Sequence, residues 1–222
     1  MFKGIMIGDC YGAAFEFSKQ MLEFNDGQQY YDHPTHMASD GSGNSLRAGQ
    51  YTDDTQMSIA VAETLLQQNF TKENFTKNFI NCFHRDVRKG YAKGFYNFLL
   101  SHTDVDTFLA DIKPQSEKNG AVMRALPLGF INFPELVIQA SDIQSSITHD
   151  TIIGRDSSRI AALSSYFLLR GGDKSDLLGF ISQTIGNNYK LEEEWTTKVP
   201  CHGIATIKAA LSVFLRTDSM LE

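Results

Sequence analysis

Hydrophobic residues recur along this chain at spacings of three and four, which is the periodicity of α-helices that face a core. The stripes with this spacing are Met57, Val61 and Leu65, widened by Ala62 and Leu66; Phe75, Phe79, Cys82 and Phe83; Leu136, Ala140, Ile143 and Ile147; Ile160, Leu163 and Phe167; and Leu177, Phe180 and Ile181.

Glycines mark the ends of two of these predicted helices. Gly171 and Gly172 follow the stripe that ends at Arg170, and Gly186 follows Ile185. A left-handed C-cap is expected at such positions. Alternating strand patterns are almost absent, so the sequence predicts an all-α fold.

Two regions add to this picture. Residues 23–50 contain turn-forming pairs such as Asp26-Gly27 without clear periodicity, which predicts a long loop that is either a lid or binding segment or plain disorder. Residues 203–216 form a further helical stripe, and Thr217-Asp218-Ser219 is typical of the N-cap of another helix. Because little sequence follows, we expect the fold to be truncated at its C-terminus.

Length and composition fit one soluble globular domain over residues 1–222. The 222 residues are 42% hydrophobic and 21% charged, and the net charge of -6 argues against a general nucleic-acid binder, which would carry clustered Lys and Arg. Cys10, Cys82 and Cys201 form no Cys-x-x-Cys pair, so neither a disulfide framework nor a thiolate zinc site is indicated.

With no signal peptide or membrane-spanning run in view, the sequence predicts a cytoplasmic protein.

The first segment with candidate chemistry lies near the N-terminus. Gly4, Gly8 and Gly12 are four apart, so they would line one side of a helix and leave a groove for a ligand or for a tightly packed helix. Asp9 and Glu16 are seven residues apart, which is about two helical turns. Both carboxylates would therefore emerge on one face, as a site or as a solvated surface.

The second segment, Tyr51-Thr52-Asp53-Asp54-Thr55, directly precedes an apolar helix. Two adjacent carboxylates and two hydroxyls are hard oxygen donors, which suit Mg²⁺, Mn²⁺ or Ca²⁺ better than zinc. The alternative is that Thr52 or Asp53 caps the helix, whose positive end favours acidic residues.

Two further polar segments border predicted helices. The turn from Ser116 to Gly120 precedes a short helix and could offer backbone N–H groups to phosphates, or be an ordinary turn. Thr148-His149-Asp150 lies between two helices, where the histidine is either structural or part of a site. His33 and His36 lack partners for a zinc site, and we assign them no role.

The order and content of these segments resemble the ADP-ribosylglycohydrolase family. Gly8-Asp9-Cys10-Tyr11-Gly12 through Glu16 is similar to the family's G-D-A-x-G…E motif, and Tyr51 to Thr55 is similar to its T-D-D-T motif. Residues 119–129 resemble N-G-A-x-M-R-x-x-P-L-G, and Thr148-His149 resembles its T-H motif. The similarity runs through Leu215, and it implies an orthogonal multi-helix, all-α domain.

The resemblance also implies roles for individual residues. Thr52, Asp53 and Asp54 would supply half of a two-metal site for Mg²⁺ or Mn²⁺, and Glu16 and Asp54 would be the catalytic residues. The bound metals would orient ribose hydroxyls and a water, or raise that water's acidity, while the glycosidic bond breaks with oxocarbenium-like character. The substrate-binding residues would be Asp9, Ser116, Asn119, Gly120, Met123 and His149.

Two features depart from the family pattern. Glu117 and Lys118 stand where members carry Tyr and Gly in a Ser-Tyr-Gly-Asn-Gly sequence, which leaves the orientation of the substrate open. The family's second metal-binding motif, D-x-D-T, would follow the helix over residues 205–216 and is absent from this sequence. Half of the expected metal ligands are therefore missing from it.

Three functions are compatible with these patterns. The favoured one is metal-dependent hydrolysis of the N- or O-glycosidic bond that links ADP-ribose to a protein or another acceptor. Alternatively, the chain binds ADP-ribose or a protein partner without hydrolysis, because half of the metal ligands are missing. A helical interaction protein that binds neither metal nor ADP-ribose is the third. Apolar surface left by missing helices would promote self-association.

Overall fold

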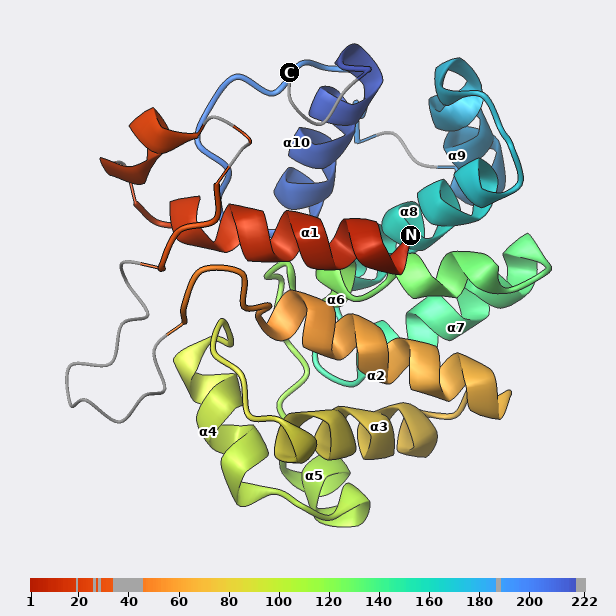
Figure 1. Ribbon diagram of the computed structural model, residues 1–222. Helices are drawn as coiled ribbons and strands as arrows, with labels where there is room; N and C mark the ends of the chain where they lie inside the picture. The colour runs from red at the N-terminus through yellow and green to blue at the C-terminus, as the bar shows by residue number, and fades with distance from the viewer. Residues whose placement is uncertain (19, 26, 28, 34–45, 187–188, 219–222) are drawn as a thin grey trace.

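The computed structural model describes residues 1–18, 20–25, 27, 29–33, 46–186 and 189–218. Within these residues the protein consists of helices without strands, which confirms the all-α prediction (Figure 1). The α-helices are α1 (Phe2–Gly12), α2 (Asp53–Gln67), α3 (Lys72–Arg85), α4 (Lys93–Ser101), α5 (Val105–Asp111), α6 (Gly120–Met123), α7 (Pro134–Ser146), α8 (Ile152–Leu169), α9 (Leu177–Ile185) and α10 (Gly203–Arg216). The 3₁₀ helices are η1 (Ala13–Phe15), η2 (Gln20–Phe24), η3 (Leu126–Phe130) and η4 (Lys174–Asp176).

Helix α8 is the centre of the fold. Helices α6, α7, α9 and α10 and the 3₁₀ helix η3 all pack on it, while α2 packs on α3 at the other side of the core. The predicted stripes of α2, α3, α8 and α9 are largely buried, as their 3.6-residue period requires. Leu66 is an exception, because it is 84% exposed and does not widen the buried stripe of α2.

The predicted helix ends are confirmed. Gly171 has a φ of +79°, and the N–H of Gly172 donates to the carbonyl of Phe167 at 3.1 Å. Gly186 has a φ of +63°, and its N–H donates to the carbonyl of Ser182 at 2.9 Å. Both are left-handed C-caps, in which the missing Cβ removes the steric penalty of positive φ.

The N-terminal segment differs from its prediction. Helix α1 ends at Gly12, and Glu16 follows η1 with extended backbone, so Asp9 and Glu16 do not share one helical face. The glycines of α1 also face open space, since a Cβ added at Gly8 would meet no described atom within 4 Å. Tight packing against another helix therefore does not explain them. Helix α1 instead lies across the surface between α10 and α2 (Figure 1).

Part of the predicted loop over residues 23–50 is described. It contains the end of η2 and then irregular chain, and the N–H of His33 donates to the carbonyl of Leu46 at 3.1 Å. The stretch from residue 34 to 45 lies outside the described residues. So does Ser219, and with it the predicted helix start, while Thr217 is the C-cap of α10. No described helix is long and apolar enough to span a membrane.

Candidate functional site

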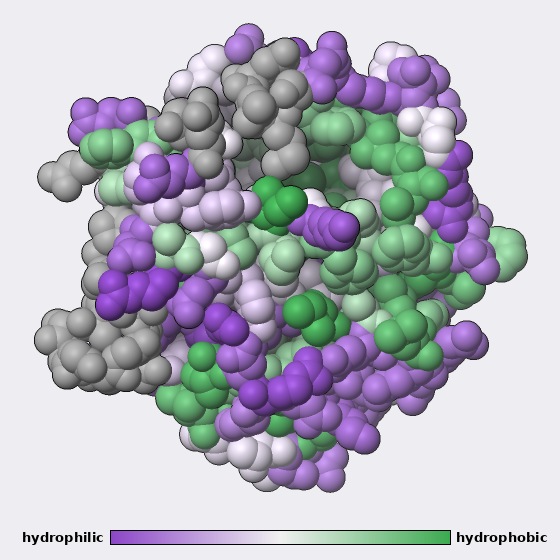
Figure 2. All heavy atoms as spheres, viewed as in Figure 1, coloured by the Kyte–Doolittle hydropathy of each residue, from purple (hydrophilic) through white to green (hydrophobic). Residues whose placement is uncertain are grey.

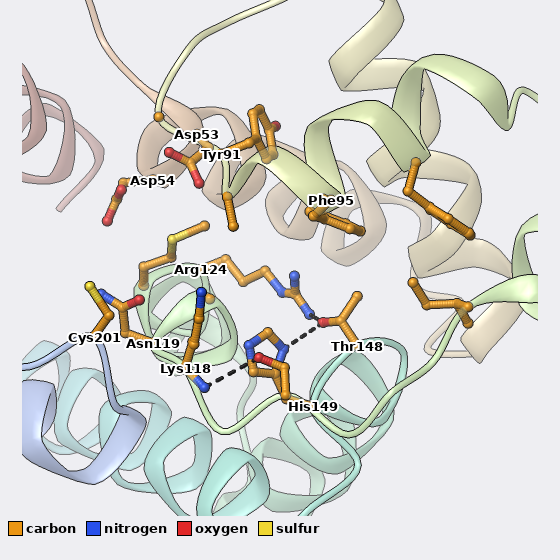
Figure 3. A pocket seen from close by; sticks show the side chains of 18 of the residues that line it. Asp53, Asp54, Tyr91, Phe95, Lys118, Asn119, Arg124, Thr148, His149 and Cys201 are labelled. Carbon is orange, nitrogen blue, oxygen red and sulfur yellow. Dashed lines mark hydrogen bonds between the residues drawn. The ribbon is translucent and has the colours of Figure 1, made fainter. Parts of the chain in front are cut away.

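A cavity of about 740 Å³ lies between α2, α4 and the chain segments before α6 and α8. Eight of the ten residues predicted to bind metal or substrate or to act in catalysis line it, from four separate stretches of the chain. Figure 3 labels Asp53, Asp54, Asn119 and His149 among them. They are Glu16, Asp53, Asp54, Ser116, Asn119, Gly120, Met123 and His149. The fold therefore brings these residues to one place, and their individual roles stay predictions.

Asp9 and Thr52 do not line the cavity but build its acidic end. The Thr52 hydroxyl donates to Asp9 Oδ1 at 2.6 Å, and the backbone N–H groups of Thr52 and Thr55 donate to Asp9 Oδ2 at 2.8 and 3.1 Å. Thr52 Oγ1 also accepts from the N–H of Asp54 at 3.3 Å, which makes Thr52 the N-cap of α2. The capping interpretation is thus confirmed, and it places Asp53 and Asp54 in the first helical turn beside the cavity.

The acidic end brings the carboxylates of Asp53, Asp54, Glu16 and Asp9 close together. Burial raises the pKa of Asp53 well above its ordinary value, and the negative charges of Asp54, Glu16 and Asp9 raise it further. Burial, then the charges of Asp9 and Glu16, raise the pKa of Asp54 to about 7. Glu16 is half exposed, and its Oε2 lies 4.0 Å from Nε2 of the buried His33. A cation bound at this end would offset the electrostatic repulsion between these carboxylates.

The chemistry of this end fits a hard divalent cation. Carboxylate and hydroxyl oxygens are the donors that Mg²⁺ and Mn²⁺ prefer, and the buried hydroxyl of Thr55 has no hydrogen-bond partner in the described structure. Mg²⁺ commonly uses one or two carboxylates and fills its shell with waters and substrate oxygens. Among the described residues, no three His, Cys, Asp or Glu side chains form a complete metal-binding group. The carboxylate and hydroxyl oxygens at this end therefore fit part of the coordination shell of Mg²⁺ or Mn²⁺.

The opposite wall of the cavity carries His149. A Cβ added at Gly120 would lie 2.9 Å from His149 Cε1, and one added at Gly154 would meet the carbonyl oxygen of His149. Both positions must be glycine for the ring and its backbone to occupy this place. The ring is buried, and the segment from Thr148 to His149 connects α7 to α8 as predicted.

An aromatic wall was not predicted. Tyr91 precedes α4, Phe95 and Phe98 lie on it, and all three line the cavity. Phe98 stacks on His102 with ring centroids 3.8 Å apart, and the Tyr91 hydroxyl donates to Gln56 Oε1 at 2.6 Å. The spacing of Tyr91, Phe95 and Phe98 is helical and could have indicated α4 from the sequence.

The departure at residues 117 and 118 changes the charge of the cavity rim. Lys118 lines the cavity with Lys113, whereas Glu117 does not line it. The carbonyl of Glu117 instead accepts the N–H of Gly203, which ties this turn to the start of α10. The cavity therefore has the carboxylates of Asp53 and Asp54 at one end, and Lys113, Lys118 and Asp111 also line it. Figure 3 shows Lys118 apart from the two aspartates.

The model of a protein family described as ADP-ribosylglycohydrolase matches residues 1–218. This chain belongs to the ADP-ribosylglycohydrolase family. ADP-ribosylhydrolase ARH3 of Bos taurus is 25% identical over 201 residues, which cover 86% of this chain and 54% of that protein. ADP-ribosylarginine hydrolase Tri1 of Pseudomonas putida is 23% identical, covering 79% of this chain and 47% of that protein.

A solved structure of this family has the same fold. It is titled ADP-ribosylglycohydrolase-related protein complex and aligns with a TM-score of 0.67 at 21% identity. The alignment covers 99% of this chain and 75% of that one. The chain thus spans about half the length of the curated relatives it matches, and three quarters of the solved chain.

Proposed function

We propose that this chain carries the ADP-ribose site of a metal-dependent hydrolase that cleaves the N- or O-glycosidic bond between ADP-ribose and a protein or another acceptor. The observation that carries the proposal is the convergence of eight predicted site residues on one cavity with an acidic end. The names of the relatives ARH3 and Tri1 describe hydrolases of ADP-ribosyl compounds, which supports the same substrate class.

Asp53, Asp54 and the hydroxyls of Thr52 and Thr55 would hold the cation at the acidic end. The bound cation would orient ribose oxygens and raise the acidity of a water. Asp9 keeps this end in place, because its three hydrogen bonds fix Thr52 and the start of α2. Glu16 and Asp54 would lie beside the ribose, where carboxylates stabilise the positive charge that develops at the anomeric carbon.

The remaining walls would bind the rest of ADP-ribose. Lys118 and the turn of Ser116, Asn119 and Gly120 would face the diphosphate, since ammonium and N–H groups bind phosphate oxygens. Phe95 and Phe98 provide a flat apolar surface that suits an adenine ring. In this arrangement the scissile bond would lie at the acidic end and the base at the aromatic wall.

Binding of ADP-ribose without hydrolysis is the second candidate function. The observation that favours it is that, among the described residues, no three His, Cys, Asp or Glu side chains form a complete metal-binding group. An assay that measures binding and turnover separately distinguishes the two candidates.

The test is the Asp54→Ala variant, assayed for release of ADP-ribose from ADP-ribosylated peptides and for stabilisation by Mg²⁺. We expect both to be lost, because the variant lacks one of the two carboxylates that we propose hold the cation. Asp106→Ala is the matched control, because Asp106 is exposed on α5 and does not line the cavity. Unchanged turnover in Asp54→Ala would refute the assignment, and Mg²⁺-dependent binding without turnover in the wild type would favour the second candidate.

A further inference from the structure

Arg124 is a buried cation whose hydrogen bonds all go to neutral groups. It is 1% exposed, and its guanidinium donates to Gln144 Oε1 at 2.6 Å and to the Gln144 carbonyl at 3.0 Å. It donates as well to the Thr148 hydroxyl at 2.8 Å, and it lies 4.4 Å from the centroid of the Phe79 ring. Burying a guanidinium costs free energy, and burial lowers the pKa of Arg124 to about 9, so the group is still a cation at neutral pH.

The donors and acceptors around Thr148 determine where each proton lies. A guanidinium can only donate, so Thr148 Oγ1 accepts from Arg124. The single hydroxyl proton of Thr148 is then free for His149 Nδ1, which lies 2.6 Å away. If Nδ1 carried the proton instead, Thr148 Oγ1 would accept hydrogen bonds from both Arg124 and His149. The hydroxyl proton of Thr148 would then have no acceptor in the described structure.

His149 is held in its neutral form and in one orientation. Burial, and then the charge of Arg124, lower the pKa of His149 to about 3, so the ring carries one proton at neutral pH. Because Nδ1 accepts from Thr148, that proton belongs on Nε2. The ring packs against Gly120 and lines the cavity, and Nε2 has no hydrogen-bond partner among the described residues (Figure 3).

We propose that Arg124 and Thr148 are positioning residues that fix His149 as the Nε2–H tautomer, so that His149 offers a permanent hydrogen-bond donor to the ligand. The chemical group it recognises is an oxygen acceptor, such as a phosphate or ribose oxygen. In this tautomer Nε2 cannot accept a proton, so His149 orients the ligand and is not a general base. The choice of ligand rests on the proposed function, whereas the tautomer does not.

The first test is nitrogen NMR of the ligand-free protein with ¹⁵N-labelled histidine. The tautomer is read from which ring nitrogen of His149 shows the chemical shift of an unprotonated nitrogen. We expect Nδ1 to be unprotonated in the wild type and in Thr148→Ser, which keeps the hydroxyl. A protonated Nδ1 in the wild type would overturn the proposal, and this spectrum decides the tautomer whether or not any variant folds.

The second test separates positioning from packing. Thr148→Val removes the hydroxyl at nearly constant volume, so we expect a mixture of tautomers and about 10-fold weaker binding of ADP-ribose. Thr148→Ser should bind within about 3-fold of the wild type, because the hydroxyl restores the hydrogen bonds. Thr76→Val is the matched control, since the Thr76 hydroxyl on α3 is buried without a hydrogen-bond partner in the described structure.

The outcomes distinguish this inference from the proposed function. An unchanged His149 tautomer in a folded Thr148→Val variant would show that the hydroxyl does not fix the ring. A wild-type protein that has the Nε2–H tautomer but binds no ADP-ribose would contradict the proposed function and leave the tautomer assignment standing. Equal losses of affinity in Thr148→Val and Thr76→Val would mean that packing, and not the relay from Arg124, accounts for the effect.

Discussion

Replacing Asp54 with asparagine should stabilise this protein when no divalent cation is bound. Asp54 lies at the acidic end of the cavity, where burial and the charges of Asp9 and Glu16 raise its pKa to about 7. The side chain gains little from hydrogen bonds, because the Thr52 hydroxyl donates to Asp9 at 2.6 Å and is 3.3 Å from Asp54. Asparagine keeps the shape and removes the charge.

The size and sign of the effect follow from the raised pKa. In the unfolded chain Asp54 loses its proton near pH 4, whereas in the folded chain it keeps the proton until about pH 7. The folded state therefore binds more protons between these values, and the free energy of unfolding falls as pH rises through this window. The shift corresponds to at most about 4 kcal/mol, and solvent in the cavity reduces the expected cost to about 2 kcal/mol.

Thermal unfolding of both proteins in EDTA from pH 4 to pH 8 measures this effect. We expect equal stability at pH 4, and at pH 8 a Tm for Asp54→Asn that is higher by about 4 to 8 °C. Adding Mg²⁺ at ten times its Kd should then stabilise the wild type by about 1.4 kcal/mol and the variant by much less.

A charge-matched control has the opposite sign. Asp142 accepts two hydrogen bonds from Arg159, at 2.6 and 2.7 Å, so Asp142→Asn should lose about 1 kcal/mol at pH 8. If Asp54→Asn were also less stable than the wild type at pH 8 in EDTA, the reasoning about uncompensated carboxylates would be refuted.

Three further predictions concern the other walls and the surface. Gly120→Ala should fold but bind ADP-ribose at least about 10-fold more weakly by calorimetry, because the new methyl group displaces His149; affinity within about 2-fold of wild type would contradict this. Lys118→Glu should weaken binding by about 10-fold at low salt and less at high salt, as expected for a charged contact. Met6→Lys with Ile7→Lys should reduce self-association in sedimentation velocity, because these two hydrophobic side chains are exposed on α1. Figure 2 shows hydrophobic residues among polar ones on this view of the surface. A wild type that is monomeric at high concentration would refute this prediction.

The sequence predicted the helices whose apolar stripes are regular. It did not predict the helices and helix ends that depend on tertiary contacts. The stripes of α2, α3 and α8 follow the 3.6-residue period because one face of each helix packs in a shared core. Helix α4 was missed, although the spacing of Tyr91, Phe95 and Phe98 could have indicated it. The end of α1 at Gly12 could not be read either, because the pattern of Gly and Ala continues past it.

The candidate site was predicted as a set of motifs but not as a geometry. Asp9 and Thr52 are 43 residues apart in sequence, so their hydrogen bonds depend on how α1 crosses α2. Arg124 belonged to a motif whose resemblance was noted, yet its function as the buried donor to Thr148 required the fold. No local sequence pattern predicts the hydrogen bonds from Arg124, at the end of α6, to Thr148, and from Thr148 to His149 before α8.

Calorimetric titration of ADP-ribose into this chain, with and without Mg²⁺, tests the central claim most directly. We predict saturable binding at one site that is at least about 10-fold tighter with Mg²⁺, because Asp53 and Asp54 would hold a cation that binds oxygens of the ligand. Absence of binding under both conditions would contradict the account, and it would mean that the cavity serves another ligand.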